Sequence, residues 1–180
     1  YFISCFYLLV YIINVIIILN QLNIENIPEI IKELTPPPGR MDMIDKGFKI
    51  IIDYAHTPDA VKNILMCVNE MATGNIYVII GCGGNRDKTK RPIMAQIATS
   101  YSTKAIFTSD NPRNENADDI INDMIRDLSN NNYEIETNRK KAILKGIQKC
   151  QKGDILLILG KGHENYQIIG NEHIHFDDKE

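Results

Sequence analysis

Apolar runs that alternate with helical patterns constrain the fold of this 180-residue chain more than any other feature. Ile76–Ile80 contains no charged residue, and in Asp154–Leu159 the only charged residue is the first. Such runs are expected for strands that are buried on both faces of a parallel sheet. We also expect strands over Phe48–Asp53, Ala105–Thr108 and Tyr133–Glu136, helices over Pro58–Ala72, Lys90–Ser100, Ala117–Leu128 and Arg139–Cys150, and a closing hairpin over 165–180. Strands that alternate with helices predict an α/β fold with a doubly wound, mainly parallel sheet.

The first nineteen residues differ from the rest of the chain. Tyr1–Leu19 carries no charge and is long enough to be a candidate membrane helix. However, no Lys or Arg follows it until Lys32, so it lacks the basic flank of a signal peptide or an anchor. A buried helix of a preceding domain, or sequence that is not native to the fold, are the other interpretations.

A proline-rich connector predicts a domain boundary. The apolar spacing within Ile24–Leu34 predicts a helix. Thr35–Arg40 contains three consecutive prolines, which cannot continue a helix and favour an extended connector. We therefore expect residues 1–34 to be an apolar, helical remnant of a preceding domain and residues 35–180 to form the α/β domain.

Charge and cysteine content exclude several classes of protein. The net charge of −3 gives no electrostatic reason to expect nucleic acid binding. The four cysteines form no C-x-x-C pair, which argues against a zinc knuckle or a disulfide framework and fits a cytoplasmic protein. His173 and His175 precede two aspartates, but no third ligand has convincing spacing, so we predict no metal site.

Two polar loops follow predicted strands. Asp110–Arg113 comes after Ala105–Thr108, and Gly160–Glu164 comes after Asp154–Leu159. Open α/β sheets bind ligands at the carboxyl ends of their strands, so both loops are candidate binding segments. The first offers a guanidinium and an amide, and the second offers a carboxylate and glycine backbone. Together they can hold both charged ends of a small zwitterion. The alternatives are a turn that starts a helix and an ordinary acidic loop.

Two further loops follow predicted strands. Gly81–Lys88 is glycine-rich, and its glycines let backbone N–H groups approach an anion. The basic residues Arg86, Lys88, Lys90 and Arg91 favour anion binding over a simple tight turn, although the spacing is not that of a G-x-x-x-x-G-K-[ST] phosphate loop. His56 lies in Asp53–Asp59, where it is placed to contact a nucleotide, but a lone loop histidine is more often a solvated hydrogen-bonding residue.

Six sequence strings carry a family resemblance. They are PPPGRMD (Pro36–Asp42), DYAHTPDA (Asp53–Ala60), GCGGNRDKTKRP (Gly81–Pro92), TSDNPRNEN (Thr108–Asn116), GKGHENYQ (Gly160–Gln167) and FDDKE (Phe176–Glu180). In this order they resemble the Rossmann-like C-terminal domain of the Mur ligases. The DNPR segment is similar to that of the members that add diaminopimelate.

The resemblance implies an ATP-dependent amide ligation in peptidoglycan synthesis. Meso-diaminopimelate would be joined to UDP-N-acetylmuramoyl-L-alanyl-D-glutamate through an acyl phosphate. The residues that match the family's diaminopimelate site are Arg86, Asp110, Asn111, Pro112, Arg113, Gly160 and Glu164. Those that match its ATP site are Arg40, Asp53, His56 and Arg139. We expect Arg113 to clamp a carboxylate and Glu164 to face the ammonium group at the distal stereocentre.

The chain also departs from the family pattern. It contains neither the phosphate loop nor the Mg²⁺-organising carboxylates, which belong to the family's central domain. ATP and Mg²⁺ would therefore be bound mainly outside this sequence. We assign no catalytic residue and expect a full-length monomeric enzyme to be active, but not this segment alone. The alternatives are a lysine-adding relative and a non-catalytic ligand-binding module tethered to a membrane by Tyr1–Leu19.

Overall fold

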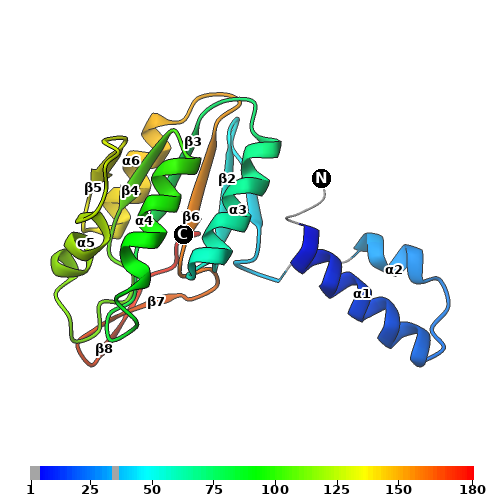
Figure 1. The fold of residues 1–180 in the computed structure, drawn as a ribbon. Helices are drawn as coiled ribbons and strands as arrows, with labels where there is room; N and C mark the ends of the chain where they lie inside the picture. The colour runs from blue at the N-terminus through cyan, green and yellow to red at the C-terminus, as the bar shows by residue number, and fades with distance from the viewer. Residues whose placement is uncertain (1–4, 34–36) are drawn as a thin grey trace.

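A computed structural model describes residues 5–33 and 37–180 of the protein. Helices α1 (Cys5–Gln21) and α2 (Ile27–Glu33) form an N-terminal pair that contact each other (Figure 1). Asn23 and Asn26 both have positive φ angles, of 53° and 63°, which a right-handed helix cannot contain. Helix α2 therefore begins at Ile27 and not at Ile24, where the sequence predicted its start. Within the described part of the chain, no helix is both long and apolar enough to cross a membrane.

Two predictions about the N-terminal part fall partly on residues that the structure does not describe. The first four residues of the apolar run Tyr1–Leu19 lie outside the described residues, and so does the predicted boundary between residues 34 and 35. The division of the chain into 1–34 and 35–180 therefore stays a prediction.

The α/β domain contains a six-stranded sheet with the order β1-β2-β6-β3-β4-β5. Its strands are β1 (Asp42–Asp45), β2 (Lys49–Asp53), β3 (Ile76–Ile80), β4 (Lys104–Phe107), β5 (Tyr133–Ile135) and β6 (Ile155–Leu159). All neighbouring pairs are parallel except β1 and β2, which confirms the predicted mainly parallel sheet. The sequence prediction missed β1, because this edge strand has only two apolar residues, Met43 and Ile44, with an aspartate on either side.

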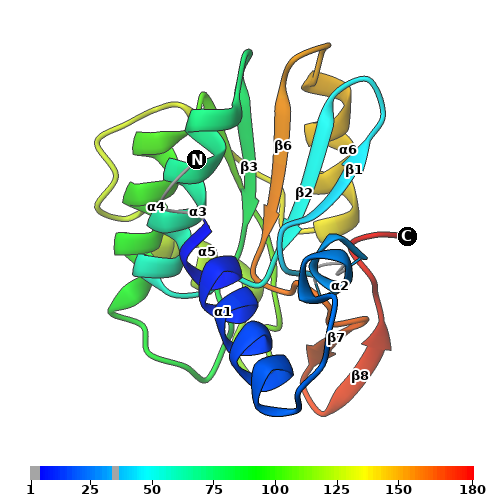
Figure 2. The ribbon, with the colours of Figure 1, turned by 90° about the vertical axis from the view of Figure 1, so that its right-hand side faces the viewer.

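Helices cover both faces of this sheet. Helices α3 (Pro58–Met71), α4 (Lys90–Tyr101) and α5 (Ala117–Ile125) lie on one face, and α6 (Arg139–Lys149) lies on the other (Figures 1 and 2). The consecutive residues Ile51 and Ile52 belong to two different cores, since neighbouring side chains of a strand point to opposite faces. The doubly wound arrangement is therefore confirmed.

The topology gathers four loops at one edge of the sheet. Strands β2, β3, β4 and β6 run in the same direction, so the loops that follow them share the carboxyl edge. Helix caps fix where two of these loops end: Thr57 Oγ1 accepts from the Ala60 N–H, and Asn116 Oδ1 accepts from the Asp118 N–H. The loop after β6 leads into the predicted hairpin, which consists of β7 (Tyr166–Ile169) and β8 (Glu172–His175).

Candidate functional site

A cavity of about 230 Å³ opens at the carboxyl edge of the sheet, between the loops that follow β2, β3, β4 and β6. Seven residues assigned from the sequence line it: His56, Arg86, Asp110, Asn111, Arg113, Gly160 and Glu164. Five further residues also line it: Lys90, Gly81 and Gly83, which the sequence linked to anion binding, and Tyr54 and Cys82, for which it indicated no ligand-binding role. All five lie in or beside the predicted loops. Their position near the end of a strand is the sequence feature from which they could have been predicted to line the cavity.

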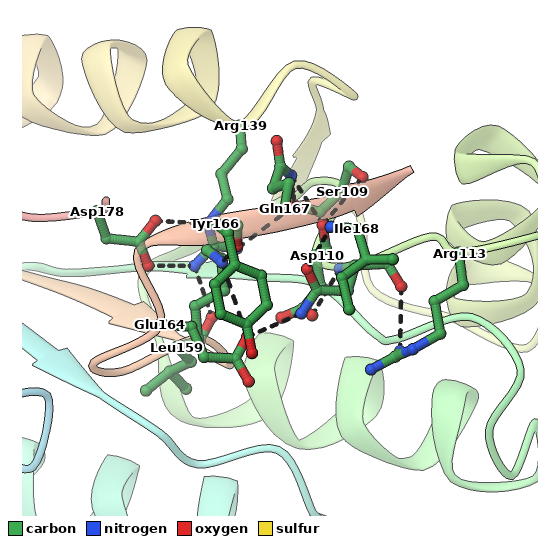
Figure 3. A network of polar contacts seen from close by, with 12 residues as sticks. Ser109, Asp110, Arg113, Arg139, Leu159, Glu164, Tyr166, Gln167, Ile168 and Asp178 are labelled. Atoms are coloured by element: carbon green, nitrogen blue, oxygen red, sulfur yellow. Dashed lines mark hydrogen bonds and ion pairs between the residues drawn. The ribbon is translucent and has the colours of Figure 1, made fainter. Parts of the chain in front are cut away.

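Glu164 presents one carboxylate oxygen to this cavity. Its Oε2 accepts a hydrogen bond from Asn111 Nδ2 at 2.8 Å and lies 3.7 Å from Lys161 Nζ. No hydrogen bond reaches Oε1 from residues 5–33 or 37–180. Figure 3 shows Glu164 and Tyr166 beside one another, to the left of Asp110. One side of the carboxylate is thus fixed by the protein and the other can accept from a ligand.

Arg113 provides a positive group on another wall of the cavity. Its backbone has a φ of 53°, and two hairpin contacts hold this unusual conformation. Arg113 N–H donates to Ile168 O at 2.9 Å, and Gly170 N–H donates to Arg113 O at 2.7 Å. In the guanidinium, NH1 donates to Gly84 O and Asn111 O, at 3.1 and 3.3 Å. The described residues leave Nε and NH2 available to a carboxylate.

Asp110 supports the floor of the cavity. It is 7% exposed, and its Oδ1 accepts from the Asn111 N–H at 2.6 Å. Burial raises the pKa of the Asp110 carboxyl, although the nearby Arg139 and Lys161 cations oppose this rise. Gly160 has a φ of +109°, and a Cβ there would lie 2.5 Å from Asp110 Oδ2. A glycine at position 160 therefore allows the two loops to approach each other.

The glycine-rich loop contributes fewer cations than its sequence suggests. Arg86 and Lys90 line the cavity. Arg91 instead is fully buried and forms ion pairs with Glu115 and Asp123, at 2.9 and 2.8 Å. Lys88 also pairs with Glu115, at 3.0 Å. Two of the four basic residues therefore hold the loop in place rather than face the cavity.

Three of the four residues that match a nucleotide site lie in or near β2. Asp53 accepts from the Met41 and Ala55 N–H groups at 3.0 and 2.8 Å, and burial raises the pKa of its carboxyl. The Arg40 guanidinium lies 4.7 Å from the centre of the Tyr54 ring. His56 is exposed, and its Nδ1 donates to Tyr54 O at 2.8 Å. Their binding of a nucleotide stays a prediction.

Besides Arg40 and Asp53, two other assigned residues do not line the cavity. Pro112 is buried and shapes the loop, since a Cβ at Gly84 would collide with Pro112 O. Arg139 has a completely buried side chain paired with Asp178 at 2.6 Å. Contact between Arg139 and a nucleotide would require this ion pair to open.

Among the described residues, the cavity lining includes neither a reactive thiol nor a cluster of metal ligands. Cys82 is 3% exposed, and burial raises the pKa of its thiol to about 12, so it stays protonated and is structural. No three His, Cys, Asp or Glu side chains of the described residues are grouped to hold a metal ion.

Comparison with known protein families gives a match over residues 39–162 to the family described as "Mur ligase, glutamate ligase domain". This match covers more than half of the chain. The chain belongs to the Mur ligase family. The family resemblance of the six sequence strings and the predicted fold class are thereby confirmed.

Similar Mur ligases are much longer than this chain. The UDP-N-acetylmuramoyl-L-alanyl-D-glutamate–2,6-diaminopimelate ligase of Bacillus cereus is 50% identical over 165 residues, which are 91% of this chain and 34% of that protein. An enzyme of the same name from Clostridium acetobutylicum is 44% identical over 88% of this chain and 34% of its own length. The chain thus spans about a third of these relatives.

Solved Mur ligase structures have the same fold. The structure of a UDP-N-acetylmuramoyl-L-alanyl-D-glutamate–2,6-diaminopimelate ligase matches with a TM-score of 0.75 and 38% identity, over 85% of this chain and 32% of that one. The UDP-N-acetylmuramate–alanine ligase of Thermotoga maritima matches with a TM-score of 0.65 over 87% of this chain and 35% of that one. At 20% identity, this second likeness concerns the fold alone.

Proposed function

We propose that this chain is the C-terminal part of an ATP-dependent ligase that adds meso-diaminopimelate to UDP-N-acetylmuramoyl-L-alanyl-D-glutamate in cytoplasmic peptidoglycan synthesis. The cavity at the carboxyl edge would bind diaminopimelate. The observation that carries this proposal is that Arg113 and Glu164 line one cavity with opposite charges, each with polar atoms that no described residue occupies.

The two side chains fit the two charges of an amino acid centre. The available Nε and NH2 groups of Arg113 suit a carboxylate, which accepts two parallel hydrogen bonds from a guanidinium. Glu164 Oε1 suits an ammonium group. Asn111 Nδ2 keeps the Glu164 carboxylate turned, so that a ligand meets Oε1 without displacing an internal bond. Arg86 would add a second cation for the carboxylate end.

This arrangement would distinguish diaminopimelate from lysine. Diaminopimelate carries an ammonium and a carboxylate on its distal carbon, whereas lysine carries an ammonium alone. With lysine bound, Arg113 would have no carboxylate partner, and a desolvated donor without a partner is costly. The site would therefore favour the diamino diacid and orient its other amino group toward the acyl acceptor.

ATP would supply the phosphoryl group that activates the acyl acceptor. On this proposal, Arg40, Asp53 and His56 contribute to the nucleotide site from the C-terminal side. Arg40 and His56 are exposed beside Tyr54 and so are accessible to such a ligand. The described residues contain no cluster of metal ligands, so Mg²⁺ would be held mainly by the central domain.

Calorimetry on this chain tests the proposal directly. We expect meso-diaminopimelate to bind about tenfold more tightly than L-lysine, corresponding to one carboxylate–guanidinium interaction. Tighter binding of lysine would instead indicate a lysine-adding relative. Equal binding of both amino acids, or binding of neither, would argue against the assigned site.

A further inference from the structure

Arg139 connects the two loops that carry the proposed ligand-binding residues. Its NH2 group donates to Leu159 O at 3.0 Å, and its NH1 group lies 3.5 Å from Ser109 O. Leu159 directly precedes Gly160, and Ser109 directly precedes Asp110. The guanidinium is thus bonded to the backbone at the start of both loops (Figure 3).

Asp178 holds this guanidinium in place from the C-terminal segment. Arg139 Nε donates to Asp178 Oδ1 at 2.7 Å, and NH2 donates to Asp178 Oδ2 at 2.6 Å. The side chains of Arg139 and Asp178 are 0% and 1% exposed. A two-point contact fixes the plane of the guanidinium, and with it the directions in which the remaining N–H groups point.

The outer ends of the two loops are joined separately, through the hairpin. Gln167 Nε2 donates to Asp110 O at 2.7 Å, and Ile168 N–H donates to Asn111 Oδ1 at 2.9 Å. These contacts tie the loop after β4 to β7, which itself continues the loop after β6. Gln167 Nε2 also lies 3.5 Å from Ser109 O, so Arg139 and the hairpin share the inner end of the loop after β4. At the inner end of the loop after β6, Arg139 NH2 is the side-chain donor to Leu159 O.

We propose that Arg139 and Asp178 are positioning residues, which set the separation of the two loops and thereby the distance between Arg113 and Glu164. This inference rests on the proposed function of the cavity. Neither residue lines the cavity. The match of Arg139 to a nucleotide-binding position is thereby replaced by a role in which this side chain acts through the loop backbones.

A double variant without either charge distinguishes the positioning of the loops by Arg139 and Asp178 from the effect of leaving a buried charge unpaired. Arg139→Met combined with Asp178→Leu removes both charges and replaces them with apolar side chains of similar volume. Such a double change often leaves a protein folded, whereas removal of one partner leaves the other as an unpaired buried charge. The matched control is Lys145→Met combined with Glu136→Gln. It removes the 3.1 Å ion pair between Lys145, a partly exposed residue of the helix α6 that also carries Arg139, and Glu136, which follows β5.

The first measurement is amide hydrogen exchange without ligand. Ser109 N–H donates to Thr137 O and Gly160 N–H donates to Asp53 O, so both amides report on the starts of the loops. In the Arg139→Met, Asp178→Leu variant we expect both to exchange roughly tenfold faster or more, while amides of β3 keep their protection. The control variant should exchange like the unmodified chain. Unchanged loop exchange in the folded double variant would overturn the proposal.

The second measurement is calorimetry with meso-diaminopimelate. The double variant should bind about tenfold more weakly than the unmodified chain and the control. Unchanged affinity in the folded double variant would also overturn the positioning role. If the unmodified chain binds no diaminopimelate, the proposed function fails, and the exchange result alone decides whether Arg139 and Asp178 position the loops.

A third variant covers the case in which the neutral pair does not fold. Arg139→Lys keeps a cation opposite Asp178, but an ammonium lacks the planar fork that reaches several acceptors at once. Its Ser109 and Gly160 amides should again exchange faster than in the unmodified chain. Exchange as slow as in the unmodified chain would overturn the proposal.

Discussion

Asn111 and Glu164 are separated by 53 residues in the sequence, yet Asn111 Nδ2 donates a 2.8 Å hydrogen bond to Glu164 Oε2. The same Asn111 side chain accepts from the Ile168 N–H through Oδ1. Its two ends are thus fixed by one carboxylate and one amide, which defines the orientation of the side-chain amide. An aspartate at position 111 could keep the second contact but not the first.

Asn111→Asp should therefore weaken both folding and ligand binding. The substitution places two carboxylate oxygens within hydrogen-bonding distance, and each disfavours the charged form of the other. We expect the free energy of unfolding at pH 7 to fall by roughly 1–3 kcal/mol, measured by urea denaturation. Asn114→Asp is the control, because Asn114 is exposed on the same loop. Equal stability of the two variants would contradict the assigned contact.

Gly160→Ala should be more damaging than Gly170→Ala. Both glycines have positive φ angles, +109° and +60°, so either alanine is strained. Only at position 160 does the added Cβ meet a neighbour, Asp110 Oδ2 at 2.5 Å, whereas nothing lies within 4 Å at position 170. We expect unfolding free energies to fall by about 1 kcal/mol for Gly170→Ala and about 2–3 kcal/mol for Gly160→Ala.

The two glycine substitutions should also differ in their effect on the affinity for diaminopimelate. Gly160→Ala should weaken binding, because the collision pushes apart the loops that line the cavity. Gly170→Ala changes a residue outside the cavity and keeps the backbone N–H that donates to Arg113 O, so it should leave the affinity unchanged. Thermal or urea denaturation combined with calorimetry checks both expectations. Equal affinities in the two variants would show that the Gly160–Asp110 approach does not shape the cavity.

The sheet could be predicted from the sequence because its central strands are continuous apolar runs. The uncharged run Ile76–Ile80 predicts a strand with the same bounds that the structure gives to β3. The parallel arrangement then brings the loops after β4 and β6 to one edge, and the cavity lies at that edge. Strand β1 escaped prediction, since its aspartates resemble loop residues and only pairing with β2 makes it a strand.

The roles of the buried arginines could not be predicted. In the sequence, Arg91 and Arg139 are basic residues near polar loops, and nothing local distinguishes them from Arg86 or Arg113. Their partners are distant: Glu115 lies 24 residues from Arg91, and Asp178 lies 39 residues from Arg139. Whether a guanidinium faces a ligand or an internal carboxylate depends on the tertiary arrangement, which residue types and spacing do not encode.

Arg113→Lys should reduce the preference for diaminopimelate over lysine. The substitution keeps the positive charge but loses the fork of Nε and NH2 that suits a carboxylate. We expect the affinity for meso-diaminopimelate to fall about tenfold, while that for L-lysine stays the same. Arg126→Lys is the control on an exposed arginine, with 56% of its side chain accessible. An undiminished preference in Arg113→Lys, measured by calorimetry, would remove Arg113 from the site.

Glu115 links the glycine-rich loop to the loop that carries Arg113, and this link should be visible in the pH dependence of stability. Hydrogen bonds from Arg91, at 3.0 and 2.9 Å, and from the Asn85 N–H lower the pKa of the Glu115 carboxyl from 4.5 to about 2. Because the folded state binds this proton less readily than the unfolded state, the contribution is complete above the ordinary pKa. It is lost as the pH falls from that value toward about 2.

Glu115→Gln should therefore lower the free energy of unfolding by roughly 2 kcal/mol at pH 7 and reduce its loss on acidification. The difference from the unmodified chain should shrink steadily below the ordinary pKa of glutamate, because the native carboxylate becomes protonated and resembles the amide. Urea denaturation at a series of pH values measures this. Glu172→Gln, at an exposed position of β8, is the control, and its free energy of unfolding should change with pH as that of the unmodified chain does. A constant offset for Glu115→Gln at all pH values would mean that the carboxylate charge does not stabilise the loop.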